Sequence, residues 1–372
     1  MSNILMLNYE FPPIGGGASP VSYDIGKGLA QLGHDITVVT MAYNDLPSSE
    51  IKDGMKIERV KCLRKEKMVC HPWEQLTYIF SAMQFITKNI DLSKIDVCYT
   101  HFIIPTGVIA YWLKKKYNIP YIITAHGSDV IGHNNKRFGF LYKLIKKPWC
   151  KIVKEAEKVV APSIYLRELM HKNEPDGKYE LIRNGVDCNI FKKGNNKKKK
   201  MLVMCRLQET KNVECVIEAI QNINLYEWDV DILGDGPCLD KLKSLVSGYR
   251  LENKIHFIGW VDNKSDKHLK YLKEASIYIS ASRVENCPTS ILEAIACGDR
   301  ILISDIPAHR QLIEEIDNTV FFDKDSPKQL SEKIQAVIFD CENTGKYSNT
   351  YDINKFNLAK TVERYNELIV NL

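Results

Sequence analysis

Residues 191–207 read FKKGNNKKKKMLVMCRL and separate two halves of the chain that have the same pattern. The first ten of these residues are polar, strongly cationic and include Gly194, which is typical of an interdomain linker. The residues that follow, 201–205, form a short apolar run that predicts a buried strand. Because apolar runs and helical patterns alternate on both sides of this stretch, we expect two similar α/β domains with a cleft between them.

The apolar runs predict where the strands lie. We expect strands at 4–7, 36–40, 97–100, 121–124 and 159–161 in the first half, and at 201–205, 230–233, 256–258, 277–280 and 301–304 in the second. Apolar runs separated by helices predict parallel sheets with helices on both faces. The predicted domains are therefore 1–195 and 196–350, and 351–372 is predicted to contain a last amphipathic helix.

Composition and charge limit the classes of protein to consider. Of the 372 residues, 45% are hydrophobic and 26% charged, which excludes a disordered chain, a collagen-like fibre and a coiled coil. The 11 cysteines include no C-x-x-C pair, so we interpret them as reduced thiols. Residues 1–195 hold 27 Lys and Arg against 19 Asp and Glu. A basic first half favours an anionic partner, and a lysine-rich composition without any partner is the alternative.

The sequence also bears on membrane contact. The first residues, MSNILMLNYEF, lack a basic region, and the longest uncharged run, 97–113, is shorter than the ~20 residues of a membrane span. We therefore expect a cytoplasmic protein. Basic and apolar residues interleave in 138–158, which suits the plane of an anionic membrane. The hypothesis is peripheral attachment there, through Lys143, Lys146, Lys147, Trp149 and Lys151. The alternative is a helix with its apolar face on the sheet and its lysines in water.

Two loops of the first half carry candidate binding residues. In NYEFPPIGGGASP, residues 8–20, glycines precede a helix whose N-terminus offers free N–H groups to an anion. Pro20 stands where a dinucleotide fingerprint has its third glycine, so a nicotinamide or flavin site fits poorly. We favour a loop that approaches a phosphate or an acceptor over a merely structural one. In TAHGSD, residues 124–129, His126 follows a strand, where parallel sheets bind ligands.

The second half carries cations and carboxylates at corresponding places. Arg206 and Lys211 bracket the loop after the strand at 201–205, and two cations there suit a diphosphate. In RVENCPTSILEAIACG, residues 283–298, Glu285 precedes a helix and Glu293 lies on its second turn, from where it reaches hydroxyls beside a bound anion. Interaction with the helix dipole is the alternative for Glu293. The first helical residues offer free backbone N–H groups to that anion: Thr289, Ser290 and Ile291.

Two further loops and two carboxylate pairs complete the candidates. The glycines of LGDGP, residues 233–237, permit close approach of a ligand. In FIGWVD, residues 257–262, Trp260 and Val261 offer an apolar edge to a flat base. The pairs at 229/231 and 323/325 read D-x-D, a spacing of carboxylates that can hold a metal ion. The first pair begins a strand and the second lies in a polar loop, so we assign no metal site.

Together, these features resemble the retaining GT-B glycosyltransferases of glycosyltransferase family 4 (glycosyl transferases group 1). The matches are the Gly-rich loop, HGSD, IRNGVD at 182–187, Arg206 with Lys211, GDGP, FIGWV and the E-x7-E pair Glu285/Glu293, and they span nearly the whole chain. The resemblance implies two Rossmann-like domains that face each other across a cleft. The N-terminal domain would bind the acceptor, the C-terminal one the nucleotide sugar, and the last helix would pack back on the N-terminal domain.

The resemblance also implies residue roles. Arg206 and Lys211 would hold the donor diphosphate, Glu293 would accept hydrogen bonds from the ribose, and Glu285 would bind the donor sugar. His126 would contact a hydroxyl of that sugar near the reacting carbon. The remaining donor contacts would be backbone ones, to the phosphates from Gly16 and Gly17 and to the base from Val261.

The implied reaction retains the anomeric configuration and needs neither a metal nor a cofactor. On frequency alone we expect a UDP-linked donor, and we expect a glycan or lipid-linked acceptor in cell-surface polysaccharide or glycoconjugate synthesis, with no nucleic acid as partner. Glu285 is followed by Asn-Cys-Pro where many relatives have Gly-Phe, which leaves the donor sugar open. Asp299 and Arg300 replace a small residue and Pro, which affects packing. The alternatives are a nucleotide-sugar epimerase of the same fold and a non-enzymatic protein that binds anionic surfaces.

Overall fold

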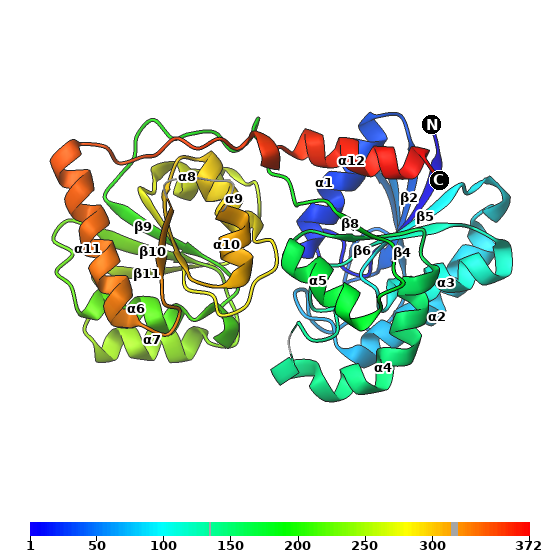
Figure 1. Ribbon diagram of the computed structural model, residues 1–372, viewed down its shortest axis with the longest axis horizontal. Helices are drawn as coiled ribbons and strands as arrows, with labels where there is room; N and C mark the ends of the chain where they lie inside the picture. The colour runs from blue at the N-terminus through cyan, green and yellow to red at the C-terminus, as the bar shows by residue number, and fades with distance from the viewer. Residues whose placement is uncertain (134, 314–318) are drawn as a thin grey trace. The chain divides into compact units, whose positions relative to one another are not determined.

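The computed structural model describes residues 1–133, 135–313 and 319–372, which form two compact units (Figure 1). The first unit comprises Met1–Gly185 and Leu358–Leu372, and the second comprises Val186–Asn357. The division precedes the expected linker by about ten residues. The reason is packing, because Phe191 is buried in the second unit's core and the Gly194 N–H donates to the Cys297 carbonyl at 3.1 Å.

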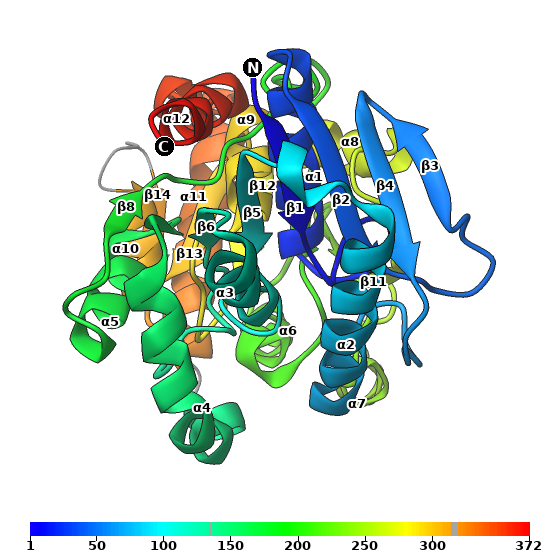
Figure 2. The ribbon, with the colours of Figure 1, turned by 90° about the vertical axis from the view of Figure 1, so that its right-hand side faces the viewer.

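The first unit contains an eight-stranded sheet in the order β3-β4-β2-β1-β5-β6-β7-β8, with β3 and β8 at its two edges (Figure 2). Neighbouring strands are parallel except for β3 and β4. The five strands expected in this half are confirmed within one or two residues of their ends. The strand bounds are β1 Asn3–Leu7, β2 Asp35–Met41, β3 Ser49–Lys52, β4 Met55–Val60, β5 Val97–His101, β6 Tyr121–Thr124, β7 Lys158–Ala161 and β8 Tyr179–Leu181.

Helices pack on the two faces of this sheet in separate core clusters. One cluster takes side chains from α2 (Pro72–Asn89), α3 (Thr106–Tyr117), α4 (Asn135–Glu155) and α5 (Ile164–Asn173), with the 3-10 turn Leu92–Lys94 beside it. The other takes them from α1 (Ala18–Gln31) and α12 (Leu358–Val370).

The last helix, α12, packs on the first unit beside α1 (Figure 1). A Cβ at Gly28 would lie 2.5 Å from a Val362 methyl, so glycine is what lets the two helices approach. The Tyr365 and Thr124 hydroxyls are 3.0 Å apart, which ties α12 to the end of β6.

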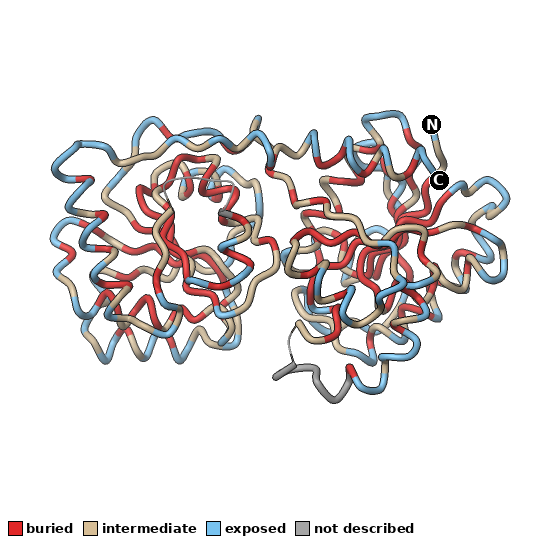
Figure 3. Tube along the Cα trace, in the orientation of Figure 1, coloured by how far each residue is buried: buried red, intermediate tan, exposed pale blue. Residues whose placement is uncertain are grey.

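The second unit contains a six-stranded sheet in the order β11-β10-β9-β12-β13-β14, and all its neighbouring strands are parallel. The five expected strands are confirmed, and β14 was not expected. The bounds are β9 Lys200–Met204, β10 Asp229–Leu233, β11 Ile255–Gly259, β12 Ile277–Ser280, β13 Arg300–Ser304 and β14 Thr319–Phe322. Figure 3 shows the strands of both units as mainly buried, which agrees with their apolar sequences.

Helices again form two groups. Side chains of α6 (Val213–Gln221), α7 (Leu239–Gly248) and α11 (Pro327–Thr344) share one cluster, and those of α8 (Asp266–Glu274), α9 (Thr289–Ala296) and α10 (Pro307–Ile313) share the other. The 3-10 turns are Glu209–Lys211 and Asn354–Phe356. Among the described residues, no helix is long and apolar enough to cross a membrane.

The departure at Asp299 has a structural reason. The Asp299 carboxylate is fully buried and forms an ion pair with the ammonium of Lys197, whose side chain is only 4% exposed. Lys197 also donates to the Leu272 carbonyl at 3.1 Å. Part of the cationic stretch that resembles a linker is therefore fixed to the second unit by a buried charge pair.

Candidate active site

Arg206 lies in the loop after β9, and the GDGP loop holds that loop in place. The Cys205 N–H donates to the Leu233 carbonyl at 3.1 Å and the Leu207 N–H to the Asp235 carbonyl at 2.9 Å. A Cβ at Gly234 would lie 1.8 Å from the Cys205 carbonyl oxygen, and one at Gly236 would lie 2.4 Å from that of Leu207. These glycines were predicted to permit close approach of a ligand; in the structure they let the loop approach the backbone on either side of Arg206.

Lys211 and Glu285 form an ion pair at the ends of β9 and β12. Lys211 ends a 3-10 turn, and its Nζ lies 2.5 Å from Glu285 Oε1. The Ser282 hydroxyl donates to the same carboxylate oxygen at 2.7 Å. The two charged side chains keep 20% and 12% of their surface exposed. They are therefore held in place and still reachable by a ligand.

Electrostatics keep both members of this pair charged. Burial works to raise the pKa of Glu285, but the Lys211 ammonium, with smaller contributions from His309 and Ser282, keeps it below its ordinary value. Burial likewise works to lower the pKa of Lys211, and Glu285 outweighs it, so that pKa is raised. A carboxylate and an ammonium therefore coexist here at neutral pH.

Glu293 lies one turn into α9, is only 5% exposed and accepts a hydrogen bond from a neutral amide. The Asn263 amide donates to its Oε1 at 3.3 Å, and His268 Nε2 lies 3.6 Å from its Oε2. Burial and Lys264 lower the pKa of His268 to about 4, so this ring is neutral at pH 7. Because the Lys264 N–H donates to His268 Nδ1 at 3.1 Å, the ring proton is on Nε2, whose hydrogen-bond partner is Met204 Sδ at 3.0 Å.

The start of α9 only partly matches the expected anion site. Thr289 and Ser290 are half-buried at the first turn. The Ile291 N–H instead donates to the Pro288 carbonyl at 3.2 Å, and the Ile291 side chain is fully buried in the core. The expectation of a free N–H at Ile291 is therefore wrong, because the first turn of the helix already uses it.

Trp260 and Val261 follow β11, as expected. Trp260 is 47% exposed, and its indole N–H donates to Asp262 Oδ1 at 3.0 Å. Val261 is half-buried against a core cluster. We name the four residues predicted to bind the donor, Arg206, Lys211, Glu285 and Glu293, the donor cluster. They follow strands or lie in the helix that begins at the carboxyl edge of the second unit's sheet.

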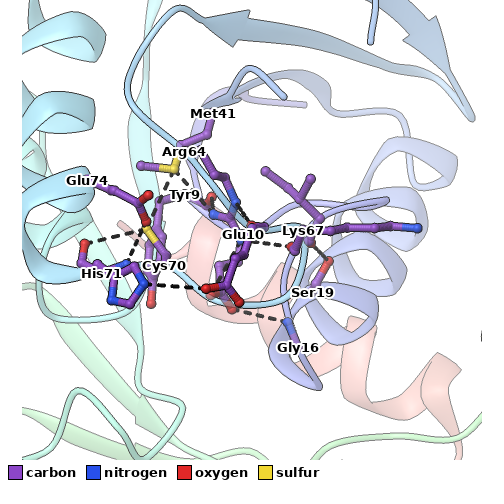
Figure 4. Close-up of polar contacts among 12 residues, drawn as sticks. Tyr9, Glu10, Gly16, Ser19, Met41, Arg64, Lys67, Cys70, His71 and Glu74 are labelled. Carbon is purple, nitrogen blue, oxygen red and sulfur yellow. Dashed lines mark hydrogen bonds and ion pairs between the residues drawn. The ribbon is translucent and has the colours of Figure 1, made fainter. Parts of the chain in front are cut away.

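The Gly-rich loop of the first unit is held by charged residues (Figure 4). Arg64, whose side chain is fully buried, donates to the Tyr9 carbonyl at 3.3 Å and to the Lys67 carbonyl at 3.0 Å. The Gly15 N–H donates to the same Lys67 carbonyl at 2.9 Å, and the Gly16 N–H donates to Glu10 Oε2 at 3.3 Å. These contacts join the loop after β1 to the loop before α2.

The three glycines of this loop differ in their surroundings. Gly15 has φ +95°, and a Cβ there would lie 2.5 Å from Glu10 Cβ, so the fold itself requires this glycine. At Gly16 and Gly17 a Cβ would meet nothing within 4 Å. Only the last two glycines thus leave space for something else to approach.

His126 belongs to a pair of neutral imidazoles. His126 Nε2 lies 3.0 Å from Nδ1 of His101, a fully buried residue that sequence reasoning missed. Burial lowers the pKa of His126 to about 3 and that of His101 well below its ordinary value. Because one proton serves the shared hydrogen bond, exchange of its direction makes His126 Nδ1 either a donor or an acceptor.

Asp129 fixes the backbone around this histidine pair. Its carboxylate accepts the Ile103 N–H at 2.8 Å and the His126 N–H at 2.9 Å. Another residue that sequence reasoning missed is His309, which is fully buried and has Nδ1 2.8 Å from the Ser304 carbonyl oxygen. The role of Asp129 does not follow from the sequence, since it depends on a contact with Ile103 in a distant segment. The contact of His309 with Ser304 is local.

The α4 residues behave in two ways. Lys143, Lys146, Lys147 and Lys151 are exposed. Trp149 is fully buried, and its indole N–H donates to the Asp129 carbonyl at 2.8 Å. The expected membrane contact of Trp149 is therefore wrong. The first residues of the 138–158 segment, up to 141, lie outside the residues whose side chains the structure describes.

Two Rossmann-like units, with polar loops at the carboxyl ends of their parallel strands, define a protein of the GT-B fold. The chain belongs to glycosyltransferase family 4: the family model described as "Glycosyltransferase Family 4" matches residues 15–190, and the one described as "Glycosyl transferases group 1" matches residues 187–350. This membership places transfer of a sugar ahead of the epimerase and non-enzymatic alternatives.

Several curated relatives match over most of their length. An uncharacterized glycosyltransferase of Methanocaldococcus jannaschii is 24% identical, over 90% of this chain and 88% of its own. N-acetyl-alpha-D-glucosaminyl L-malate synthase of Bacillus anthracis is 25% identical, over 77% of this chain and 75% of its own. Alpha-monoglucosyldiacylglycerol synthase of Streptococcus pneumoniae is 21% identical, over 84% of this chain and 73% of its own.

Solved structures share the fold. Anabaena HepE in complex with UDP and glucose has a TM-score of 0.77 and is 16% identical, over 100% of both chains. Sucrose-phosphate synthase from Thermosynechococcus elongatus has the same TM-score and identity, over 100% of this chain and 97% of its own. At this level of identity the likeness concerns the fold alone.

Proposed function

We propose that this glycosyltransferase is a retaining, metal-independent enzyme that moves a hexosyl group from a UDP-linked sugar to a glycan or lipid-linked acceptor in cell-surface glycan synthesis. The observation that carries the proposal is the donor cluster, in which Lys211 and Glu285 are both charged and Glu293 is held as a hydrogen-bond acceptor. A pyrophosphate, a sugar and a ribose need these three kinds of group.

The roles of the cations follow from the negative charge that develops on the leaving diphosphate during sugar transfer. When the bond between the anomeric carbon and the diphosphate breaks, the electron pair leaves with the diphosphate. Arg206 and Lys211 stabilise that charge, so protein cations serve where other enzymes use a metal. Before the donor binds, Glu285 holds Lys211 at the strand end at 2.5 Å, which fixes the ammonium in advance.

An exposed indole, two similar proteins and the α4 lysines support the choice of base and acceptor. Trp260, 47% exposed, offers an aromatic surface near the donor cluster's edge of the sheet. UDP is the nucleotide in the complex of the similar Anabaena HepE, and the Streptococcus pneumoniae relative is by its name a synthase of a glycolipid. A lipid-linked acceptor fits the exposed α4 lysines, which favour peripheral contact with an anionic membrane face.

Thermal unfolding with a panel of nucleoside diphosphates, in the presence of EDTA, tests this proposal. A ligand at a hundredfold excess over its Kd adds ~2.7 kcal/mol to the free energy of unfolding. We expect UDP to raise the Tm of the wild type but not of Arg206→Ala or Glu293→Ala. Lys328→Ala, an exposed change on α11, is the matched control. No shift with any nucleotide would contradict the donor site.

A further inference from the structure

The outer face of α2 carries three large apolar side chains in water. Trp73, Leu76 and Phe80 are 50%, 57% and 72% exposed. Their spacing of three and four residues places them on one side of the helix. The opposite side packs into the core through Tyr78, Ala82 and other residues. Scattered exposed apolar residues are ordinary, but a contiguous group marks an interaction surface.

We propose that this α2 face, Trp73, Leu76 and Phe80, inserts into the interfacial layer of an anionic phospholipid membrane. The proposal deepens the membrane contact in the proposed function, because it names the apolar anchor that α4 does not supply. On α4, Trp149, Ile152 and Val153 are buried in the core. That helix therefore brings charge to the surface and little apolar area besides Leu144, which is 65% exposed.

The charges around the α2 face suit an anionic surface. The single acidic residue of α2, Glu74, is fully buried and accepts the Lys65 N–H at 2.8 Å and the His71 N–H at 2.7 Å. Its negative charge is thus turned away from solvent. Lys88 near the end of the helix is exposed, and so are three lysines of the loop before it: Lys61, Lys65 and Lys67. The same loop has one exposed carboxylate, Glu66, which lies 3.6 Å from His71 Nε2, so cations outnumber it there.

The same helix layer extends these cations. Figure 2 shows α3 between α2 and α4, and the two pairs of helices are in contact. Lys116 on α3 and the four named lysines of α4 are exposed. An interfacial membrane protein needs both aromatic or aliphatic side chains that insert and lysines that meet anionic headgroups. Here one layer of helices supplies both.

A second copy of the chain fits this face less well. Three side chains, at roughly 150–250 Å² for each aromatic one, fall short of the ~800 Å² per partner of a standard interface. The surrounding lysines would also repel their symmetry mates across a twofold interface. A lipid surface has neither problem, since its charge is opposite and its area unlimited.

Flotation of the full chain with two kinds of vesicle tests the proposal. One kind contains phosphatidylcholine with phosphatidylglycerol, and the other contains phosphatidylcholine alone. We expect the wild type to float with the anionic vesicles at low salt and to be released by high salt. Phe80→Ser should lower the partition coefficient about tenfold, since burying such a side chain is worth one to two such factors. Trp73→Ser combined with Leu76→Ser should lower it further.

Matched variants separate this effect from loss of folding. Phe339 on α11 of the second unit is 70% exposed, so Phe339→Ser removes a comparable side chain and should leave flotation unchanged. Lys146→Gln combined with Lys147→Gln should weaken flotation and reduce its salt dependence. The Tm shift with UDP should persist in every α2 variant, so failure of the donor site would show in the wild type without vesicles.

Three results would overturn the proposal. They are no flotation of the wild type, equal flotation of the wild type and Phe80→Ser, or concentration-dependent dimerisation of the wild type that Phe80→Ser abolishes. The last would assign the α2 face to a second copy of the chain.

Discussion

The strand-end loops of the two units handle charge in opposite ways. In the second unit, Lys211 and Glu285 form a charged pair that a ligand can still reach. In the first unit, Arg64 and Asp129 are buried and bonded to backbone groups, so the loops present glycine backbone and the neutral ring of His126. Under the proposed function, this contrast predicts that the second unit recognises the charge on the donor and that the first unit contributes shape and hydroxyl contacts.

The largest effect is expected when the cation of the charged pair in the second unit is removed. Lys211→Ala should lower kcat about 10²–10³-fold, because it removes a preorganised cation that stabilises the leaving diphosphate. Steady-state kinetics with the preferred donor measures this loss. Lys241→Ala, which removes a surface ion pair with Glu214, is the control and should stay near the wild-type rate. A Lys211→Ala enzyme within a few-fold of the wild type would remove Lys211 from the mechanism.

Acid should lower the free energy of unfolding of both units, because each unit contains a buried histidine that stays neutral. The pKa of His268 is about 4 in the folded chain against about 6.5 when unfolded. The unfolded state therefore binds the extra proton first, and the free energy of unfolding falls as pH drops from 6.5 towards 4. Burial of His268 alone accounts for about 3 kcal/mol over this window.

Denaturant unfolding between pH 4 and 7 measures this dependence. His268→Gln should flatten the part of the slope that belongs to the second unit, and His126→Gln the part that belongs to the first. Each substitution introduces a side-chain amide that can donate a hydrogen bond in place of the imidazole N–H. An unchanged slope in both variants would show that neither ring is held neutral.

The smallest expected effect separates two adjacent glycines. Gly15→Ala should destabilise the first unit by about 1–3 kcal/mol, since it forces a left-handed residue against Glu10. Gly16→Ala should change stability little, because its Cβ meets nothing within 4 Å. If Gly16 approaches the donor phosphates, the same change raises the donor KM. Equal Tm values for both variants would contradict the difference.

The sequence predicts the parallel core because buried strands are continuous apolar runs. The same reasoning does not predict β3 and β4, because their charged residues interrupt the apolar pattern. Glu58 and Arg59 of β4 are buried, yet they pair with Lys56 at 2.8 Å and Glu50 at 2.5 Å. A run of charged residues indicates an exposed segment only when no oppositely charged side chain lies nearby. Here β3 supplies such a side chain, Glu50, to Arg59.

The candidate site shows the same limit. Lys211 and Glu285 were predicted because each follows an apolar strand, although the sequence gives no sign that they pair. His101 and His268 were missed because they contact residues far along the chain, His126 and Met204. His309 was missed although its contact with Ser304 is local, because a lone histidine forms no motif. Trp149 was misplaced because an alternation of lysines and apolar residues fits both a membrane surface and a helix packed on a sheet.

Binding titrations in EDTA test the central claim most directly. UDP, and separately a UDP-sugar, is titrated into the wild type, Arg206→Ala and His126→Ala. We predict that UDP binds the wild type with the same Kd with and without added Mg²⁺. Arg206→Ala should lose this binding, and His126→Ala should keep it while binding the UDP-sugar less tightly. Binding of UDP that requires Mg²⁺, or that falls equally in both variants, would contradict the assignment of donor charge to the second unit.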